Sequence, residues 1–177
     1  MHLPEIEVAG NALRISIGEG RVGGVNDSYR ATLGSCVGLC VVWSNQSKFV
    51  LAHVLLPHES SAAIPRKCRA RYADTVVPWA IEQLEVPSCS IRELVAYVAG
   101  GARMFADSQQ THVGDDNQQA LIDSLRQHRV RVKGSDFGGE EGRQLVVDGP
   151  SRRVFSLGLE RDLVTRWEFP RSFGAAA

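Results

Sequence analysis

The sequence lacks any apolar run of about eighteen residues, the length that a membrane-spanning helix requires. Its first ten residues, MHLPEIEVAG, also lack the charged segment and following apolar segment that mark a secretory signal peptide. No charge is in excess, because 20 basic residues balance 20 acidic ones, and general binding to nucleic acid or to an anionic membrane needs a basic face. We therefore expect a cytoplasmic protein that neither inserts directly into a membrane nor binds nucleic acid.

Cysteine is scarce, with only Cys36, Cys40, Cys68 and Cys89 in the chain. No two of them have the C-x-x-C spacing of a redox pair. Cytoplasmic cysteines are ordinarily reduced, and 177 residues are enough to bury a core without disulfides or metal. We expect four free thiols.

The length favours a single domain over residues 1–177, with a core at about residues 12–160 and a frayed C-terminal tail. Apolar residues at helical spacing predict two main helices, at 71–85 and 115–128, with Asp74 as a cap and Pro78 near the first turn of the former. Alternating or β-branched runs predict about eight strands, at 11–20, 29–33, 37–43, 48–56, 93–101, 130–134, 144–148 and 152–159. This order predicts a layered α/β (α+β) domain with a mixed or antiparallel sheet and flanking helices.

The segment at residues 90–105 has two interpretations. Ser90 and Glu93 have the spacing of a helical capping box. The run ELVAYVAGG equally fits a strand that stops at a glycine pair, and we favour the strand.

Cysteine and histidine residues between positions 36 and 58 are open to three interpretations. Cys36, Cys40, His53 and His58 follow the zinc-finger pattern C-x3-C-x12-H-x4-H. Against zinc, His53 lies in a strand-like run and Pro57 would break a helix at His58, whereas such a finger needs both histidines on one helix. Secondly, these cysteines can simply pack in a core, as Cys40 would between two apolar neighbours.

The third interpretation makes Cys36 a nucleophile. It follows Gly34 and Ser35 in a run where small residues break the strand pattern, which lets a substrate carbonyl approach. Backbone N–H groups from Ser35 to Val37 would then form an oxyanion hole. His53 follows seventeen residues later, one hairpin away, where its imidazole can serve the thiol as a base.

Taken together, these segments resemble the CheD-type chemoreceptor glutamine deamidases of bacterial chemotaxis. LGSCVGLCVVW followed by LAHVLLP is similar to the signature of that family. RYADTVVPW, VAGGARMF, NQQALIDSLRQHRVRV and SDFGGEEGR resemble further family segments in the same order. The resemblance extends from about Ile15 to Leu159 and implies a sandwich related to toxin-type cysteine deamidases.

The resemblance implies roles for particular residues. Cys36 matches the family's nucleophile and His53 its base. The third catalytic residue of the family is a threonine, for which Thr32 is available two residues closer to the cysteine than usual, with Arg30 at the usual place. Either the turn is shorter here or Thr32 is only a turn residue. The family's GGN-like loop reads Gly138–Glu140, which replaces an amide with a charge.

The activity implied is hydrolysis of glutamine side-chain amides on the cytoplasmic domains of methyl-accepting chemoreceptors, with no metal or organic cofactor. The main alternative is a weak or inactive adaptor that binds receptors or a chemotaxis phosphatase. A cysteine peptidase is a second rival, although the sequence around Cys36 lacks papain-like and caspase-like signatures.

Overall fold

Two five-stranded sheets form the centre of the molecule. The computed structural model describes residues 4–59, 66–103, 113–159 and 163–171. Sheet A has the order β1-β3-β8-β9-β10 and sheet B the order β2-β5-β4-β6-β7. All strand pairs are antiparallel except β1 with β3 and β6 with β7.

The strands of sheet A are β1 (Leu13–Arg14), β3 (Ser28–Leu33), β8 (Arg143–Asp148), β9 (Arg153–Gly158) and β10 (Val164–Glu168). Those of sheet B are β2 (Gly20–Gly23), β4 (Val37–Trp43), β5 (Lys48–Val54), β6 (Val95–Gly100) and β7 (Arg131–Phe137). The α-helices are α1 (Pro4–Asn11), α2 (Ala73–Gln83) and α3 (Val113–Gln127). Short 3₁₀ helices are η1 (Ser44–Gln46), η2 (Arg66–Arg71) and η3 (Ser88–Glu93).

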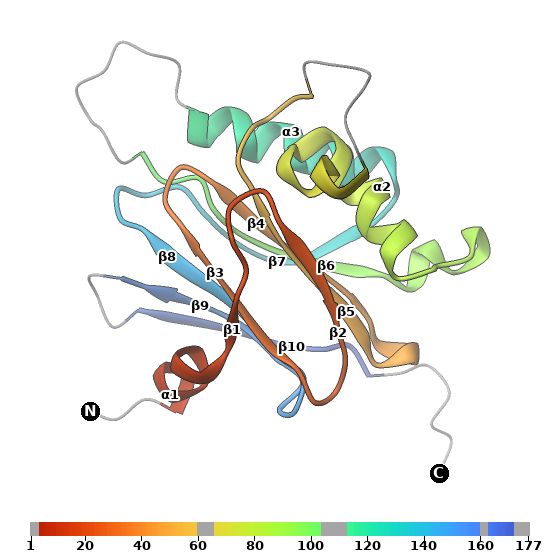
Figure 1. The fold of residues 1–177 in the computed structure, drawn as a ribbon, viewed down its shortest axis with the longest axis horizontal. Helices are drawn as coiled ribbons and strands as arrows, with labels where there is room; N and C mark the ends of the chain where they lie inside the picture. The colour runs from red at the N-terminus through yellow and green to blue at the C-terminus, as the bar shows by residue number, and fades with distance from the viewer. Residues whose placement is uncertain (1–3, 60–65, 104–112, 160–162, 172–177) are drawn as a thin grey trace.

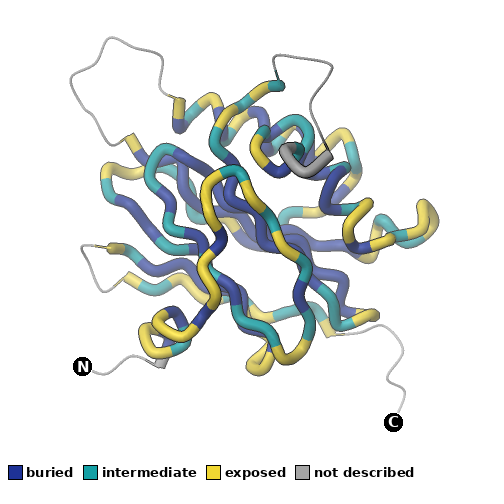
Figure 2. Tube along the Cα trace, viewed as in Figure 1, coloured by how far each residue is buried: buried dark blue, intermediate teal, exposed yellow. Residues whose placement is uncertain are grey.

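The layers follow from the period of two along each strand. On β4, Leu39 and Val41 face the cluster formed with α2 and α3, whereas Cys40 and Val42 face sheet A. Helices α2 and α3 lie together at the top of the view in Figure 1, and α1 lies at the lower left. The inner strands β4, β5, β6 and β8 are mostly dark blue, hence buried, in Figure 2, whereas the edge strands are mainly intermediate or exposed. The predicted layered α/β (α+β) class is confirmed.

Local signals predicted most of these elements. The strands β3, β4 and β5 lie where the sequence predicts them, and β6 confirms the strand interpretation of the glycine-ended run. The residues of the capping-box pattern lie in η3, which ends before β6 begins. In the described residues, no helix is long and apolar enough to cross a membrane.

One expectation about the elements was wrong, and two elements were missed. The predicted strand at 11–20 is divided into the two-residue β1, an extended connection and β2. Neither α1 nor β10 was predicted. Residues 172–177 of the expected C-terminal tail lie outside the described residues.

Pro78 lies inside α2 rather than in its first turn, because the helix begins at Ala73 and has Tyr72 as its N-cap. A proline there removes the N–H that would bond to the carbonyl of Asp74. The hydroxyl of Ser124 in α3 donates to that carbonyl instead, at 3.3 Å. Packing of one helix against the other thus satisfies the group that the proline leaves free.

Candidate active site

The turn that carries Cys36 connects β3 of sheet A to β4 of sheet B. Each of its three carbonyls accepts a hydrogen bond. The carbonyl of Gly34 accepts from the backbone N–H of Ala102 at 2.8 Å, and that of Cys36 accepts from the N–H of Gly101 at 2.8 Å. The carbonyl of Ser35 accepts from Nδ2 of Asn117 at 3.1 Å. These bonds hold the turn in one conformation.

The glycine pair that ends β6 lets the chain approach this turn. Gly100 has a φ of 101°, which L side chains rarely adopt, and a Cβ at this position would overlap the carbonyl of Cys36. Gly101 has a φ of 66° and lies against the side chain of Gln118. Glycine is therefore required here by both backbone conformation and space.

The turn leaves two amides available for an oxyanion. No backbone carbonyl of the described residues accepts a hydrogen bond from the N–H of Ser35 or Cys36. Val37 lies between Val54 and Gly100 in the sheet, so its amide belongs to the ladder. Of the amides from Ser35 to Val37, those of Ser35 and Cys36 thus have no backbone acceptor among the described residues, whereas that of Val37 is part of the sheet.

His53 lies on β5 and faces sheet A, as Cys36 does. It is directly opposite Gly38 in the antiparallel pair, and the alternation along β4 places Cys36 on the same face as Gly38. Cys36 precedes Gly38 by two residues and lies just outside the paired strand, so it is diagonal to His53 at the end of the sheet. Within a regular ladder, such neighbours are about 7–8 Å apart, within reach of long side chains. A Cβ on Gly38 would approach Leu145 and Leu33 to 2.9 Å, so glycine lets the sheets meet closely beside the imidazole.

The connection between β1 and β2 wraps around His53. The backbone N–H of His53 donates to the carbonyl of Glu19, and its carbonyl accepts from the N–H of Gly18, both at 2.8 Å. Its Nδ1 lies 3.4 Å from the carbonyl of Ile15. A carbonyl can only accept, so Nδ1 is assigned the proton and Nε2 carries the lone pair. Within the described residues, Nε2 is buried and has no hydrogen-bond partner.

Burial sets the charge of both groups. It raises the pKa of the Cys36 thiol, and the hydrogen bond from that residue's own N–H opposes part of this rise. Burial lowers the pKa of His53; the hydrogen bond to Ile15 opposes this, and the charge of Arg14 adds to it. Both shifts favour the neutral form, of the thiol and of the imidazole. No hydrogen bond between Cys36 and His53 occurs among the described residues, and such bonds commonly tighten only when substrate binds.

Cys40 and His58 lie away from this pair. Cys40 is fully buried, and four residues of strand place it about 13 Å along β4 from Cys36. His58 is exposed, and its Nδ1 lies 3.5 Å from Oδ2 of Asp74. The described residues contain no group of three or more metal-ligating side chains. The structure therefore does not bring the four residues of the zinc-finger pattern together, and packing of Cys40 in the core is confirmed.

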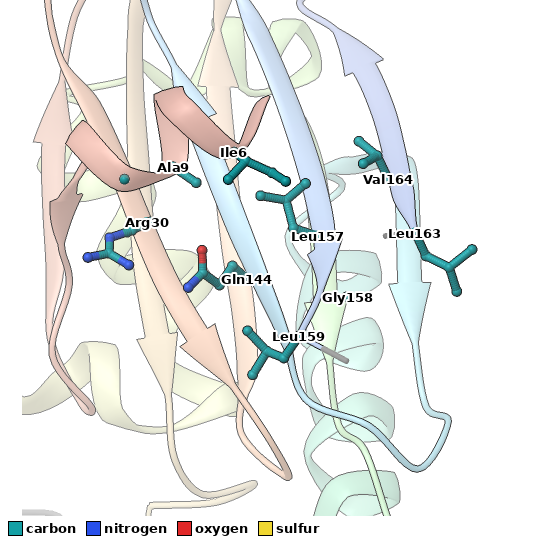
Figure 3. Close-up of a pocket in the computed structure, with 10 residues that line it drawn as sticks. Ile6, Ala9, Arg30, Gln144, Leu157, Gly158, Leu159, Leu163 and Val164 are labelled. Carbon is teal, nitrogen blue, oxygen red and sulfur yellow. The ribbon is translucent and has the colours of Figure 1, made fainter. Parts of the chain in front are cut away.

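Thr32 is not brought to the pair by the structure. On β3, Ala31 and Leu33 are buried between the sheets, whereas Thr32 is only partly buried and faces the other side of sheet A. Arg30, at the family's usual threonine position, shares that outer face. Its side chain lines a groove of about 320 Å³ beside α1, together with Gln144, and Figure 3 shows both side chains. The strand alternation thus separates the expected third residue from the thiol, and the carbonyl of Ile15 contacts the imidazole instead.

The loop at Gly138–Glu140 lies at the same end of the sheets. The N–H of Gly138 donates to the carbonyl of Gly100, and the carbonyl of Gly139 accepts from the N–H of Arg103, both at 2.9 Å. The guanidinium of Arg143 donates a hydrogen bond to the carbonyl of Gly138. The exposed Glu140 therefore lies on a loop that is tied to the glycine pair next to Cys36.

Sequence reasoning missed two partners of this site. The carbonyl of Ile15 has no side-chain signature, so no motif could have identified it. Asn117 had a signal, because it occupies the same helical stripe as Ala120, Leu121 and Leu125. A polar residue on a buried stripe indicates a specific hydrogen-bonding role.

The sequence is similar to a protein-family model and to named proteins of other organisms. A family model described as CheD chemotactic sensory transduction matches residues 55–156. A protein of Bdellovibrio bacteriovorus named probable chemoreceptor glutamine deamidase CheD is 34% identical over 139 residues, covering 76% of this chain and 87% of that protein. A namesake from Methanococcus vannielii is 38% identical over 138 residues, covering 76% and 87%.

A further relative of the same name, from Archaeoglobus fulgidus, is 34% identical over 156 residues, covering 85% of this chain and 98% of that protein. Cys36 and His53 precede the segment that the family model matches.

Proposed function

The chain belongs to the CheD family, and on this premise we propose that it is a protein-glutamine deamidase of chemotaxis signalling. The reaction is hydrolysis of a glutamine side-chain amide of a chemoreceptor to glutamate, with release of ammonia. The family that the sequence resembles is confirmed by the match. The observation that most supports an enzyme is the unpartnered Nε2 of His53, on the same face as the Cys36 thiol.

In the first half of the proposed reaction, Nε2 of His53 takes the proton of the Cys36 thiol. Sγ then bonds to the carboxamide carbon, and the C=O electrons move onto oxygen. As the intermediate collapses, the C–N bond breaks and the imidazolium gives its proton to the departing ammonia. The product is a thioester between Cys36 and the glutamine side chain.

The second half restores the enzyme. Neutral His53 takes a proton from water, and the hydroxide bonds to the thioester carbon. The C–S bond then breaks, Sγ recovers a proton from the imidazolium, and the product leaves as glutamate. Each cycle consumes one water and uses no oxidant, metal or organic cofactor.

The surrounding backbone supports the charges that develop in both halves. Among the described residues, no backbone carbonyl accepts from the amides of Ser35 and Cys36. The amide of Ser35 can therefore donate to the oxyanion, and that of Cys36, which contacts its own thiol at rest, can do so once Sγ has bonded to the substrate. The carbonyl of Ile15 holds Nδ1–H and stabilises the imidazolium, the task that an acceptor side chain performs in other hydrolases. Thr32 has no part in this mechanism.

The proposed substrates are the cytoplasmic domains of methyl-accepting chemoreceptors, which places the reaction in the cytoplasm. Each of the three relatives is named a probable chemoreceptor glutamine deamidase. A chemotaxis phosphatase is the proposed regulatory partner, as the resemblance implies.

The test is to incubate the purified protein with a chemoreceptor cytoplasmic fragment and to map glutamine-to-glutamate conversion by peptide mass spectrometry. We expect conversion at particular glutamines with the native protein and none with Cys36→Ala. Conversion by Cys36→Ala would rule out this nucleophile. Receptor binding by the native protein without conversion would favour the adaptor, and cleaved receptor backbone would favour a peptidase.

A further inference from the structure

We propose that Asn117 is a positioning residue that sets the placement of Cys36 relative to His53. Its side-chain amide joins the turn of the nucleophile to the end of the strand that carries the base. This inference rests on the proposed function, because it assigns Asn117 a task in that reaction.

Both N–H bonds of the Asn117 amide are committed. Nδ2 donates to the carbonyl of Ser35 and to the carbonyl of Leu55, each at 3.1 Å. Both partners are carbonyls, which can only accept, so the orientation of the amide is fixed. Ser35 directly precedes Cys36, and Leu55 lies two residues after His53. One side chain on α3 therefore spans the two segments whose spacing determines the reaction.

The bond to Ser35 also aims the amide of Cys36. The carbonyl of Ser35 and the N–H of Cys36 belong to one planar trans peptide, in which they point in opposite directions. Holding the carbonyl toward α3 directs the N–H away from the helix, to the side of the thiol that it contacts. Asn117 thus orients a donor that the proposed mechanism uses for the oxyanion.

The bond to Leu55 replaces a missing rung of the sheet. Pairing of β4 with β5 ends at Val37 and Val54. The next pair along the same register would be Cys36 with Leu55, where the turn has left the sheet. The Asn117 amide connects the chain segments at this point.

Stability alone does not account for this asparagine. It is fully buried, and Oδ1 accepts no hydrogen bond within the described residues. Leaving a buried acceptor unsatisfied is unfavourable, and the neighbouring stripe positions are apolar, such as Ala120 and Leu121. The benefit that offsets this burial is the placement of the two carbonyls.

The test compares Asn117→Ala with Ser124→Ala. Ser124 is a matched control, because it is also buried on α3 and also donates to a backbone carbonyl, that of Asp74, away from Cys36. We expect Asn117→Ala to lower kcat for receptor deamidation about 100-fold, the effect of a small misplacement of reacting groups, with KM within about twofold. Ser124→Ala should retain kcat within about twofold, with any loss confined to thermal stability.

A double-mutant cycle separates positioning from general damage. If Asn117 acts through the alignment of Cys36 with His53, its replacement should have little further effect once His53→Gln has removed the base. The cycle is run on kcat and also on the rate at which iodoacetamide alkylates Cys36 at neutral pH. The alkylation rate needs no receptor, so it tests Asn117 even where the native protein shows no deamidation and the proposed function has failed.

Additive losses in the cycle would overturn the proposal, as would native kcat and alkylation rates in Asn117→Ala. Where Asn117→Ala does not fold, Asn117→Asp provides the same test, because it keeps the shape and removes the amide donors. Native rates in a folded Asn117→Asp protein would equally overturn the proposal.

Discussion

Cys36, just before β4, and Cys40, within β4, lie on the same face of the strand but in different polar surroundings. Cys36 and Cys40 face the same sheet and are both buried, at 8% and 0% exposure. Around Cys40, burial alone acts and raises the pKa of the thiol far above its ordinary value. Around Cys36, an amide contacts the thiol, and His53, whose Nε2 has no hydrogen-bond partner among the described residues, lies diagonally across the sheet. Exposure therefore distinguishes these residues less than the polar groups around them.

The difference arises where the ladder stops. Cys40 lies between Leu51 and Tyr97, with paired strands on both sides. Cys36 comes just before the first paired residue of β4, where side chains and loop amides replace the ladder. An end of this kind frees backbone N–H groups while keeping the chain rigid, which is what an oxyanion site needs.

The largest expected effect comes from removing each thiol in turn. Cys36→Ala should lower receptor deamidation at least about 1000-fold, because the nucleophile is lost. Cys40→Ala should keep activity within about twofold and lose about 1 kcal/mol of unfolding free energy, because it leaves a small cavity in the core. Deamidation by mass spectrometry and urea unfolding measure the two effects. Loss of activity in Cys40→Ala rather than in Cys36→Ala would contradict the assignment of Cys36 as the nucleophile.

His53→Gln should lower kcat by about 100-fold to 10,000-fold, the range for loss of a general base. In the native protein, activity should persist as pH falls below about 6.5, the ordinary histidine pKa, because burial lowers the pKa of His53 and keeps the base neutral. Activity should then fall when the imidazole is protonated. A pH profile of kcat/KM measures this, and an acid limb above the ordinary histidine value would contradict the assignment.

Gly100→Ala tests the rigidity of the Cys36 end. It should lose about 1–3 kcal/mol of unfolding free energy, because alanine at positive φ is strained and its Cβ meets the carbonyl of Cys36. Gly10→Ala in α1 is the matched control, since nothing lies within 4 Å of its Cβ position. It should change stability by about 1 kcal/mol at most, in the favourable direction. Equal effects in urea unfolding would show that the Cys36 end tolerates displacement.

The smallest expected effect is that of Thr32→Val. Thr32 faces the outer side of sheet A, away from the thiol, so kcat for deamidation should stay within about threefold of the native value. Val preserves the shape and removes the hydroxyl. A loss of 100-fold or more would return Thr32 to the catalytic set and contradict the described orientation of β3.

Much of the Cys36 end could be predicted because its signals are local. The alternation in β4 and β5 and the glycine-rich turn were enough to place Cys36 and His53 one hairpin apart. The outward direction of Thr32 was also readable, since Ala31 and Leu33 alternate with it as apolar residues.

The rest of the site depends on packing that no local pattern contains. The carbonyl of Ile15 reaches His53 only because β1 and β2 belong to different sheets. Asn117 follows Ser35 by 82 residues in the chain, and it reaches the turn only because α3 covers the end of sheet B. A backbone carbonyl and a single amide gain their roles from the assembled tertiary structure.

The most direct test of the central claim is the rate at which iodoacetamide alkylates each cysteine at neutral pH, resolved by peptide mass spectrometry. Cys36 should react much faster than the exposed Cys89, and Cys40 should not react in the folded protein. In His53→Gln, the reaction of Cys36 should move to alkaline pH, because burial raises the pKa of the thiol and no base remains to take its proton. An alkylation rate of Cys36 that is unchanged by His53→Gln would contradict the account.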